Sequence, residues 1–152
     1  MYDTVLLPTD GSEGTAAAAE HAGTIAARFD ATVHVVSVAD ERNRFESPSA
    51  GLASEAWDER ERERAEAAAE ETAAALPDGV PVEVAVVEGV PHEAIVEYAG
   101  DAGVGVVVMG THGRTGLDHY LVGSVAEKVV RTSPVPVLTV GLDRHEADES
   151  GE

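Results

Sequence analysis

The chain of 152 residues contains 29 Asp and Glu against 10 Lys and Arg, has a formal net charge of −19, and contains no cysteine. The length suits a single domain with a sizeable core. So large an acidic excess repels phosphate backbones and anionic lipids, which argues against a sequence-independent nucleic-acid binder and a membrane-surface protein. The absence of cysteine excludes disulfides, thiolate catalysis and cysteine-ligated zinc.

The amino-terminal segment has no basic stretch followed by an apolar one, and nowhere does the sequence reach the roughly 20 apolar residues that a spanning helix needs. We therefore expect a cytoplasmic protein. The acidic residues are spread along the whole chain, and Lys128 is the only lysine. This composition indicates a halophilic protein, because concentrated salt screens the repulsion between surface carboxylates.

Short β-branched runs alternate with alanine-rich amphipathic stretches, a pattern typical of an α/β fold with a parallel sheet and helices on both faces. Strands are predicted at residues 4–8, 32–38, 82–87, 104–109 and 135–140. Helices are predicted at about 12–28 with Ser12 as N-cap, at about 54–76, from Pro91 to before Gly103, and at about 124–131.

The other segments of the chain are predicted from composition. Residues 58–64, with the sequence DERERER, are predicted to form the solvated face of the second helix. Residues 40–53 are polar, contain Pro and Gly, and are predicted as a loop. We expect one domain over residues 1–141, followed by an acidic, disordered tail at 142–152.

A glycine-rich segment follows the predicted fourth strand, with glycines at 110, 113 and 116 and a Gly123-Ser124 pair at the start of a helix. Ligands in an open parallel sheet bind beyond the carboxyl ends of the strands, where the strand order reverses. Glycine lets backbone amides approach an anion, and a helix start adds unpaired N–H groups. The segment therefore predicts a phosphate-binding loop, with Arg114 as a further donor. The alternative is a simple turn, with Ser124 and Glu127 forming a capping box.

The spacing Gly110-x2-Gly113-x9-Gly123-Ser124 resembles the nucleotide motif of the universal stress protein family. Residues 1–12 (MYDTVLLPTDGS) and 133–140 (SPVPVLTV) also resemble the ends of that family, and the resemblance extends over about residues 1–141. It implies a five-stranded sheet of order 3-2-1-4-5, Rossmann-like and similar to the adenine nucleotide α-hydrolases. It also implies ATP as ligand. Because the histidines show no metal-ligand spacing, we expect Mg²⁺ to arrive on the nucleotide, held by phosphates and waters with Asp10 nearby.

The resemblance also implies which residues lie along the nucleotide. Pro8, Thr9 and Asp10 would lie under the adenosine, and the backbone of Val38 would contact the adenine edge. Met109 and Gly110 would border the ribose. Thr111 and His112, which come next, are also predicted as cofactor-binding residues, with His112 near a phosphate. Gly113, Arg114, Thr115 and Gly116 would wrap the phosphates, with Gly123, Ser124 and Val125 donating from the helix start.

Enzymatic alternatives have less support in the sequence. The histidines lack metal-ligand spacing, and neither Ser12 nor Ser124 lies in a Gly-x-Ser-x-Gly elbow. Slow ATP hydrolysis or phosphotransfer, and binding of AMP or a cyclic nucleotide, remain open. The last predicted strand, 135–140, should form a sheet edge, and in the resembled family this strand mediates a homodimer. A nucleotide-responsive stress protein would also need a downstream protein partner, which the sequence does not identify.

Overall fold

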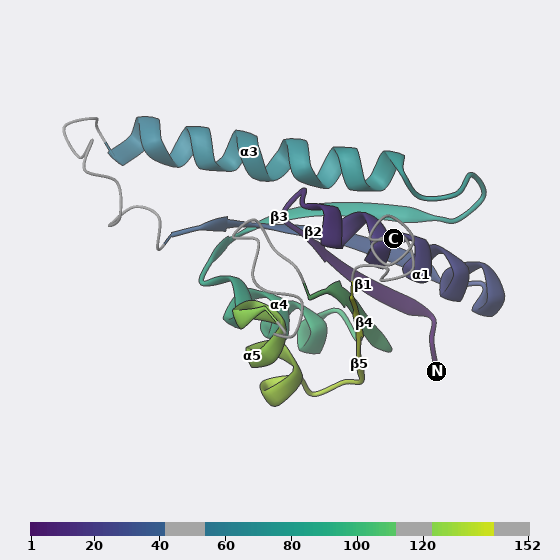
Figure 1. Ribbon diagram of the computed structural model, residues 1–152. Helices are drawn as coiled ribbons and strands as arrows, with labels where there is room; N and C mark the ends of the chain where they lie inside the picture. The colour runs from purple at the N-terminus through teal and green to yellow at the C-terminus, as the bar shows by residue number, and fades with distance from the viewer. Residues whose placement is uncertain (42–53, 112–122, 142–152) are drawn as a thin grey trace, which may run out of the picture.

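The computed structural model describes residues 1–41, 54–111 and 123–141, and for 54–57 the backbone alone. Strands and helices alternate along the chain, and each predicted element is present (Figure 1). The strands are β1 (Thr4–Thr9), β2 (Thr32–Asp40), β3 (Val82–Gly89), β4 (Val106–Gly110) and β5 (Val137–Val140). The helices are α1 (Glu13–Phe29), α3 (Ser54–Ala74), α4 (Pro91–Asp101) and α5 (Ser124–Thr132).

The strands form one five-stranded sheet in the order β3-β2-β1-β4-β5, and all four neighbouring pairs are parallel. This confirms the predicted order 3-2-1-4-5. The chain adds β2 and then β3 on one side of β1, and returns to place β4 and then β5 on the other side. The strand order therefore reverses between β1 and β4.

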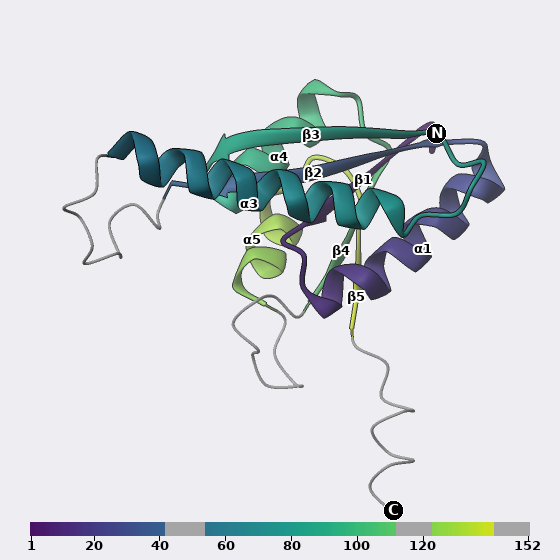
Figure 2. The same ribbon diagram turned by 90° about the horizontal axis from the view of Figure 1, so that it is seen from above.

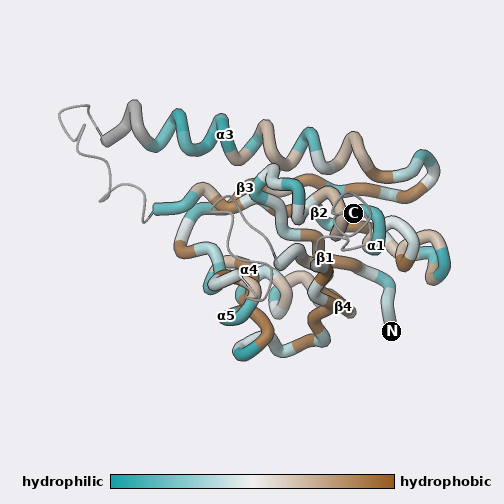
Figure 3. The backbone as a smooth tube through the Cα atoms, in the orientation of Figure 1, coloured by the Kyte–Doolittle hydropathy of each residue, from teal (hydrophilic) through white to brown (hydrophobic). Residues whose placement is uncertain are grey.

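Helices cover both faces of the sheet: α1 and α3 lie on one face, and α4 and α5 on the other (Figures 1 and 2). Alternate residues of β1 enter two separate cores, with Val5 and Leu7 packed toward α1 and α3 and Leu6 packed toward α4 and α5. The central strands are mostly apolar because both of their faces are largely buried. In Figure 3, much of the sheet is coloured as hydrophobic, whereas α3 contains many hydrophilic segments.

Several element boundaries differ from prediction because local hydrogen bonds intervene. β4 begins at Val106 rather than at 104, since the Val104 amide donates back to the Ala99 carbonyl of α4 at 3.2 Å. β5 begins at Val137 rather than at 135, because the Ser133 hydroxyl lies 2.7 Å from the Val135 carbonyl oxygen and 3.1 Å from its amide. Side-chain bonds of this kind compete with strand pairing.

Within the ranges given above, no helix combines the length and the apolar character needed to span a membrane.

Candidate functional site

The reversal of strand order places the carboxyl ends of β1 and β4 side by side in the centre of the sheet. In this fold class, that position is the usual ligand crevice. The segments that meet there are the turn after β1, the last residues of β4, and the start of α5. They contain most of the described residues that the sequence predicts for the site.

The turn after β1 is fixed by two side chains. The Oδ1 atom of Asp10 accepts hydrogen bonds from the Ser12 amide at 2.9 Å and from the Thr15 hydroxyl at 3.2 Å. The Oγ1 atom of Thr9 accepts from the Gly11 amide at 3.1 Å and lies 2.7 Å from the Thr72 hydroxyl of α3. Ser12 is the N-cap of α1, as predicted, although its side chain makes no cap bond. Asp10 therefore supplies the oriented negative charge at the positive end of α1.

Gly110 ends β4 against the first turn of α1. A Cβ atom on Gly110 would lie 2.5 Å from the carbonyl oxygen of Gly14 and 2.6 Å from its carbonyl carbon. Both are backbone atoms of a buried residue, so they have little room to move. Glycine at position 110 thus has a packing role: it allows α1 to lie close to the end of β4.

Gly123 links the start of α5 to the end of β4. Its amide donates to the Thr111 carbonyl oxygen at 2.9 Å, and the Thr111 amide donates to Val140 of β5 at 3.0 Å. A Cβ atom on Gly123 would lie 2.6 Å from the same Thr111 oxygen. Thr111 and Gly123 are therefore held together next to the switch point.

The N-cap of α5 is Gly123, with Ser124 as the first helical residue. The alternative in which Ser124 caps the helix in a box with Glu127 is wrong, since the Glu127 carboxylate instead pairs with Arg131 at 2.5 Å. The first helical bond runs from the Glu127 amide to the Gly123 carbonyl at 2.9 Å. The N–H groups of Ser124, Val125 and Ala126 precede it and have no partner within the helix, so α5 begins with donors that suit an anion.

The other predicted site residues divide into two groups. The side chains of Pro8, Val38 and Met109 are buried, and Val38 and Met109 belong to the core beneath α4 and α5, so only their backbone is left for a ligand. Val38 lies on β2, which β1 separates from β4. Residues His112, Gly113, Arg114, Thr115 and Gly116 lie outside the described residues.

The sequence prediction missed two charged residues of α3 at the end of β2. Glu61 is only 8% exposed, and its Oε1 atom accepts a hydrogen bond from the Asp40 amide at 3.2 Å. Arg64 pairs with that same oxygen at 2.5 Å and reaches the Val38 carbonyl oxygen at 3.4 Å. The predicted solvated face is therefore wrong at Glu61, and at Arg64, whose side chain is 27% exposed, it holds only in part. The signal was the spacing from Glu61 to Ala65, Ala68 and Thr72, which places Glu61 on the buried face of the helix.

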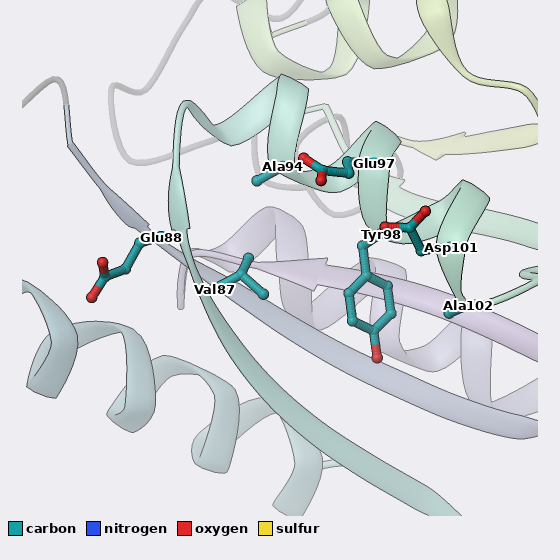
Figure 4. Close-up of a pocket in the computed structure, with 7 residues that line it drawn as sticks. All are labelled: Val87, Glu88, Ala94, Glu97, Tyr98, Asp101 and Ala102. Atoms are coloured by element: carbon teal, nitrogen blue, oxygen red, sulfur yellow. The ribbon is translucent and has the colours of Figure 1, made fainter.

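A separate pocket of about 390 Å³ lies between β3 and α4 (Figure 4). The Tyr98 hydroxyl of this pocket lies 2.8 Å from His34 Nδ1, and His34 Nε2 lies 2.8 Å from Glu83. Burial raises the pKa of Tyr98, and the nearby Glu83 carboxylate raises it further. The pocket is lined by Val87, Glu88, Ala94, Glu97, Tyr98, Asp101 and Ala102.

Across the described part of the chain, no three His, Asp or Glu side chains are grouped to hold a metal ion.

Fold and site together define a doubly wound parallel α/β protein with its candidate ligand crevice between β1 and β4. The model of the universal stress protein family matches residues 1–141. This chain belongs to the universal stress protein family.

Individual relatives extend over nearly the whole chain. Universal stress protein MJ0531 of Methanocaldococcus jannaschii is 38% identical over 151 residues, covering 96% of this chain and 86% of the relative. The solved structure of MJ0577, from the same organism, is 35% identical with a TM-score of 0.82, covering 94% of this chain and 98% of that one. A universal stress protein crystallised in complex with cAMP is 28% identical with a TM-score of 0.62, covering 93% and 98%.

Proposed function

We propose that this chain is an ATP-binding universal stress protein that acts in the cytoplasm as a dimeric, nucleotide-responsive regulator. The observation that supports it most is the start of α5, where the amides of Ser124, Val125 and Ala126 precede the first helical bond. The bond from Gly123 to Thr111 holds these donors beside the end of β4, at the switch point of the sheet. Phosphate groups are the ligands that such a helix start favours.

The bound nucleotide would extend across the carboxyl edge of the sheet. Its adenosine would lie near Pro8, Thr9 and Asp10, with the adenine edge at the backbone of Val38. Its ribose would lie at Met109 and Gly110, next to Thr111. The phosphates would lie at the start of α5, at Gly123, Ser124 and Val125, and against His112, Gly113, Arg114, Thr115 and Gly116.

The donors present fit a nucleotide that carries Mg²⁺. The cation, held by phosphates and water, would neutralise part of the ligand charge. Asp10 follows β1 at the same edge, and the bonds from Ser12 and Thr15 fix the orientation of its carboxylate, which suits a hydrogen bond to metal-bound water. A net charge of −19 opposes a polyphosphate, but concentrated salt shortens that repulsion to a few ångströms, within which the amides act.

The proposed output is a change of shape or partner rather than a chemical product. Efficient phosphoryl transfer needs a residue that positions and activates the attacking group. The Asp10 carboxylate already accepts hydrogen bonds from Ser12 and Thr15, which fix the turn after β1. Purified protein with ATP should therefore show no turnover that scales with protein concentration. Turnover abolished by Asp10→Ala or Ser124→Ala would instead favour a slow ATPase.

A second candidate ligand is cyclic AMP or AMP. It is favoured by the similarity of this chain to the universal stress protein solved in complex with cAMP. Both candidates use the same nucleoside contacts and differ at the phosphates. The three ligands can be ranked by how well cAMP, AMP and unlabelled ATP each displace bound labelled ATP. If cAMP displaces it at a lower concentration than unlabelled ATP does, the second candidate is favoured.

We place the dimer interface at β5, which is one edge of the sheet. An edge strand exposes unpaired backbone groups, and Leu138 on β5 is 39% exposed. Pairing of two copies about a two-fold axis would cover this edge. Leu138→Lys should convert a dimer into a monomer in sedimentation velocity, while Val84→Lys, on the opposite edge strand β3, should leave the dimer intact. A dimer that survives Leu138→Lys would contradict this placement.

The test of ATP binding uses a proline at the first helical position of α5. Ser124→Pro removes one amide donor, and the position tolerates proline because its N–H has no partner within the helix. The preceding Gly123 has φ −54° and ψ 151°, a conformation that suits the residue before a proline. Ser124→Ala is the matched control, since it removes the hydroxyl and keeps the N–H group.

Titration of the nucleotide-stripped protein with ATP-Mg in concentrated salt gives the readout. Wild type and Ser124→Ala should bind, and Ser124→Pro should bind about tenfold more weakly, as expected for loss of one hydrogen bond to a charged group. A wild-type protein that does not bind ATP would overturn the proposed function. Equal binding by the proline and alanine variants would show that the Ser124 amide does not contact the ligand.

A further inference from the structure

Glu61 and Arg64 join α3 to the carboxyl end of β2. The Glu61 Oε1 atom accepts the Asp40 amide at 3.2 Å, the Arg64 Nε group at 3.1 Å and the Arg64 Nη2 group at 2.5 Å. Arg64 Nη2 also lies 3.4 Å from the Val38 carbonyl oxygen. Two side chains of α3 thus hold the last residues of β2, next to the backbone of Val38.

One terminal nitrogen of the Arg64 guanidinium takes no part in these hydrogen bonds. Its Nη1 atom is buried and has no hydrogen-bond partner within residues 1–41, 54–111 and 123–141. A buried donor without an acceptor is unfavourable, and such groups in folded proteins call for a specific explanation. The only other side-chain atom of this kind in those ranges is Ser37 Oγ, which lies on β2 one residue before Val38. Both unsatisfied groups therefore occur at the same end of β2.

The position and charge of the pair determine which part of a nucleotide it suits. Strands in a sheet are about 4.8 Å apart, so the end of β2 lies about 10 Å from the end of β4, across β1. This places Arg64 at the nucleoside end of the proposed site, away from the phosphates at α5. Glu61 neutralises the guanidinium at 2.5 Å, so the pair has little attraction for an anion. An uncharged acceptor, such as a ring nitrogen of a purine, matches both properties.

We propose that Arg64 is a base-recognition residue, whose Nη1 group donates to a ring nitrogen of the bound purine while Nη2 and Glu61 hold the Val38–Asp40 backbone against the base. This inference rests on the proposed nucleotide site. It adds to that site a side chain from α3, outside the glycine motif. It also gives the mixed-charge sequence of α3 a role at its buried face.

The test compares ATP with adenosine, which has the base and no phosphate. Arg64→Met should lower the affinity for both ligands by the same factor, about tenfold for one hydrogen bond in a buried setting. Arg64→Lys should behave like Arg64→Met, because an ammonium group can pair with Glu61 but lacks the second nitrogen. Arg60→Met is the control, since Arg60 is on the same helix and exposed. Ser124→Pro should weaken ATP and leave adenosine unchanged.

The outcomes separate this inference from the proposed function. If wild type binds neither ligand, the nucleotide site itself is wrong. If wild type binds and folded Arg64→Met keeps its adenosine affinity, Arg64 does not contact the base. Full affinity in Arg64→Lys would show that charge alone matters, which also overturns the inference.

A measurement on the wild-type protein tests the inference even if the Arg64 variants do not fold. The side-chain ¹⁵N resonances of Arg64, assigned by comparison with Arg64→Lys or by through-bond correlation, should shift when adenosine is added and stay in place when tripolyphosphate is added. A shift with tripolyphosphate alone would contradict a role in base recognition.

Discussion

The amide of Gly123 donates a hydrogen bond to the carbonyl oxygen of Thr111, 2.9 Å away, and so joins the start of α5 to the end of β4. Thr111 is in turn held by β5, through the bond from its amide to Val140. The first residues of α5 are thereby tied to the sheet. The two bonds together connect the start of α5 to both β4 and β5.

Gly123→Ala should break this junction, because the added Cβ would lie 2.6 Å from the Thr111 carbonyl oxygen. We expect a loss of about 1–3 kcal/mol in the free energy of unfolding, typical of overpacking against backbone that cannot move freely. Urea denaturation in concentrated salt measures it.

The control for Gly123→Ala is Gly100→Ala in α4, where an added Cβ would meet nothing within 4 Å. Replacing a helical glycine by alanine should raise the free energy of unfolding by about 0.5–1 kcal/mol. The two alanine variants should thus shift stability in opposite directions. A Gly123→Ala protein as stable as wild type would contradict the close contact at Thr111.

Thr72→Val should destabilise the turn after β1. The Thr72 hydroxyl lies 2.7 Å from Thr9 Oγ1, and both residues are buried. Loss of this bond should lower the free energy of unfolding by about 1 kcal/mol, as measured by chemical denaturation.

Ser37→Ala serves as the matched control, since the Ser37 hydroxyl is also buried but has no partner among the described residues. Removal of an unpartnered hydroxyl should leave stability unchanged or increase it. If Ser37→Ala costs as much as Thr72→Val, the hydrogen bond at Thr9 is not the source of the effect.

Tyr98 should make the stability of the protein depend on alkaline pH. Its pKa in the folded state is raised above the ordinary value of 10.0, first by burial and then by Glu83. A raised pKa means that the folded state holds the proton more tightly. The resulting stabilisation is full below pH 10 and is lost as the pH rises through 10 toward the folded-state pKa.

Comparison with Tyr98→Phe isolates this effect, because other groups titrate in both proteins. The difference in unfolding free energy between wild type and Tyr98→Phe should be constant up to about pH 9 and should shrink at higher pH. A difference that stays constant, or grows, above pH 10 would contradict the assigned direction of the shift.

Salt should stabilise the fold. With a formal charge of −19, surface carboxylates repel one another in dilute buffer. The screening length falls from about 10 Å at 0.1 M to about 3 Å at 1 M salt, which removes most of this repulsion. The midpoint of thermal unfolding should therefore rise as KCl is added. A midpoint that falls would contradict the proposed adaptation to concentrated salt.

The fold follows from sequence because the signals for it are local. Apolar runs such as 104–109 and alanine-rich stretches such as 12–28 alternate along the chain, and this suffices for a parallel sheet with helices on both faces. Exact strand ends depend on particular hydrogen bonds, such as those of Ser133 with Val135, which the apolar pattern does not contain.

The site is only partly visible in the sequence, since its contacts join distant segments. The glycine spacing identifies Gly110 and Gly123, but the reasons for those glycines are the Gly14 backbone and the Thr111 carbonyl, which only the fold brings close. Charge pattern alone makes Glu61 and Arg64 look like surface residues. Glu61 is buried and Arg64 is partly buried because α3 packs on β2, which is a long-range relationship.

The most direct test of the proposed site follows the backbone amide resonances of ¹⁵N-labelled protein as ATP-Mg is added in concentrated salt. Binding at the switch point predicts saturable shifts at the amides of Ser124, Val125 and Ala126 and in the turn at Asp10, larger than any at Tyr98. Unchanged α5 amides at saturating ATP, or shifts confined to the pocket between β3 and α4, would contradict it.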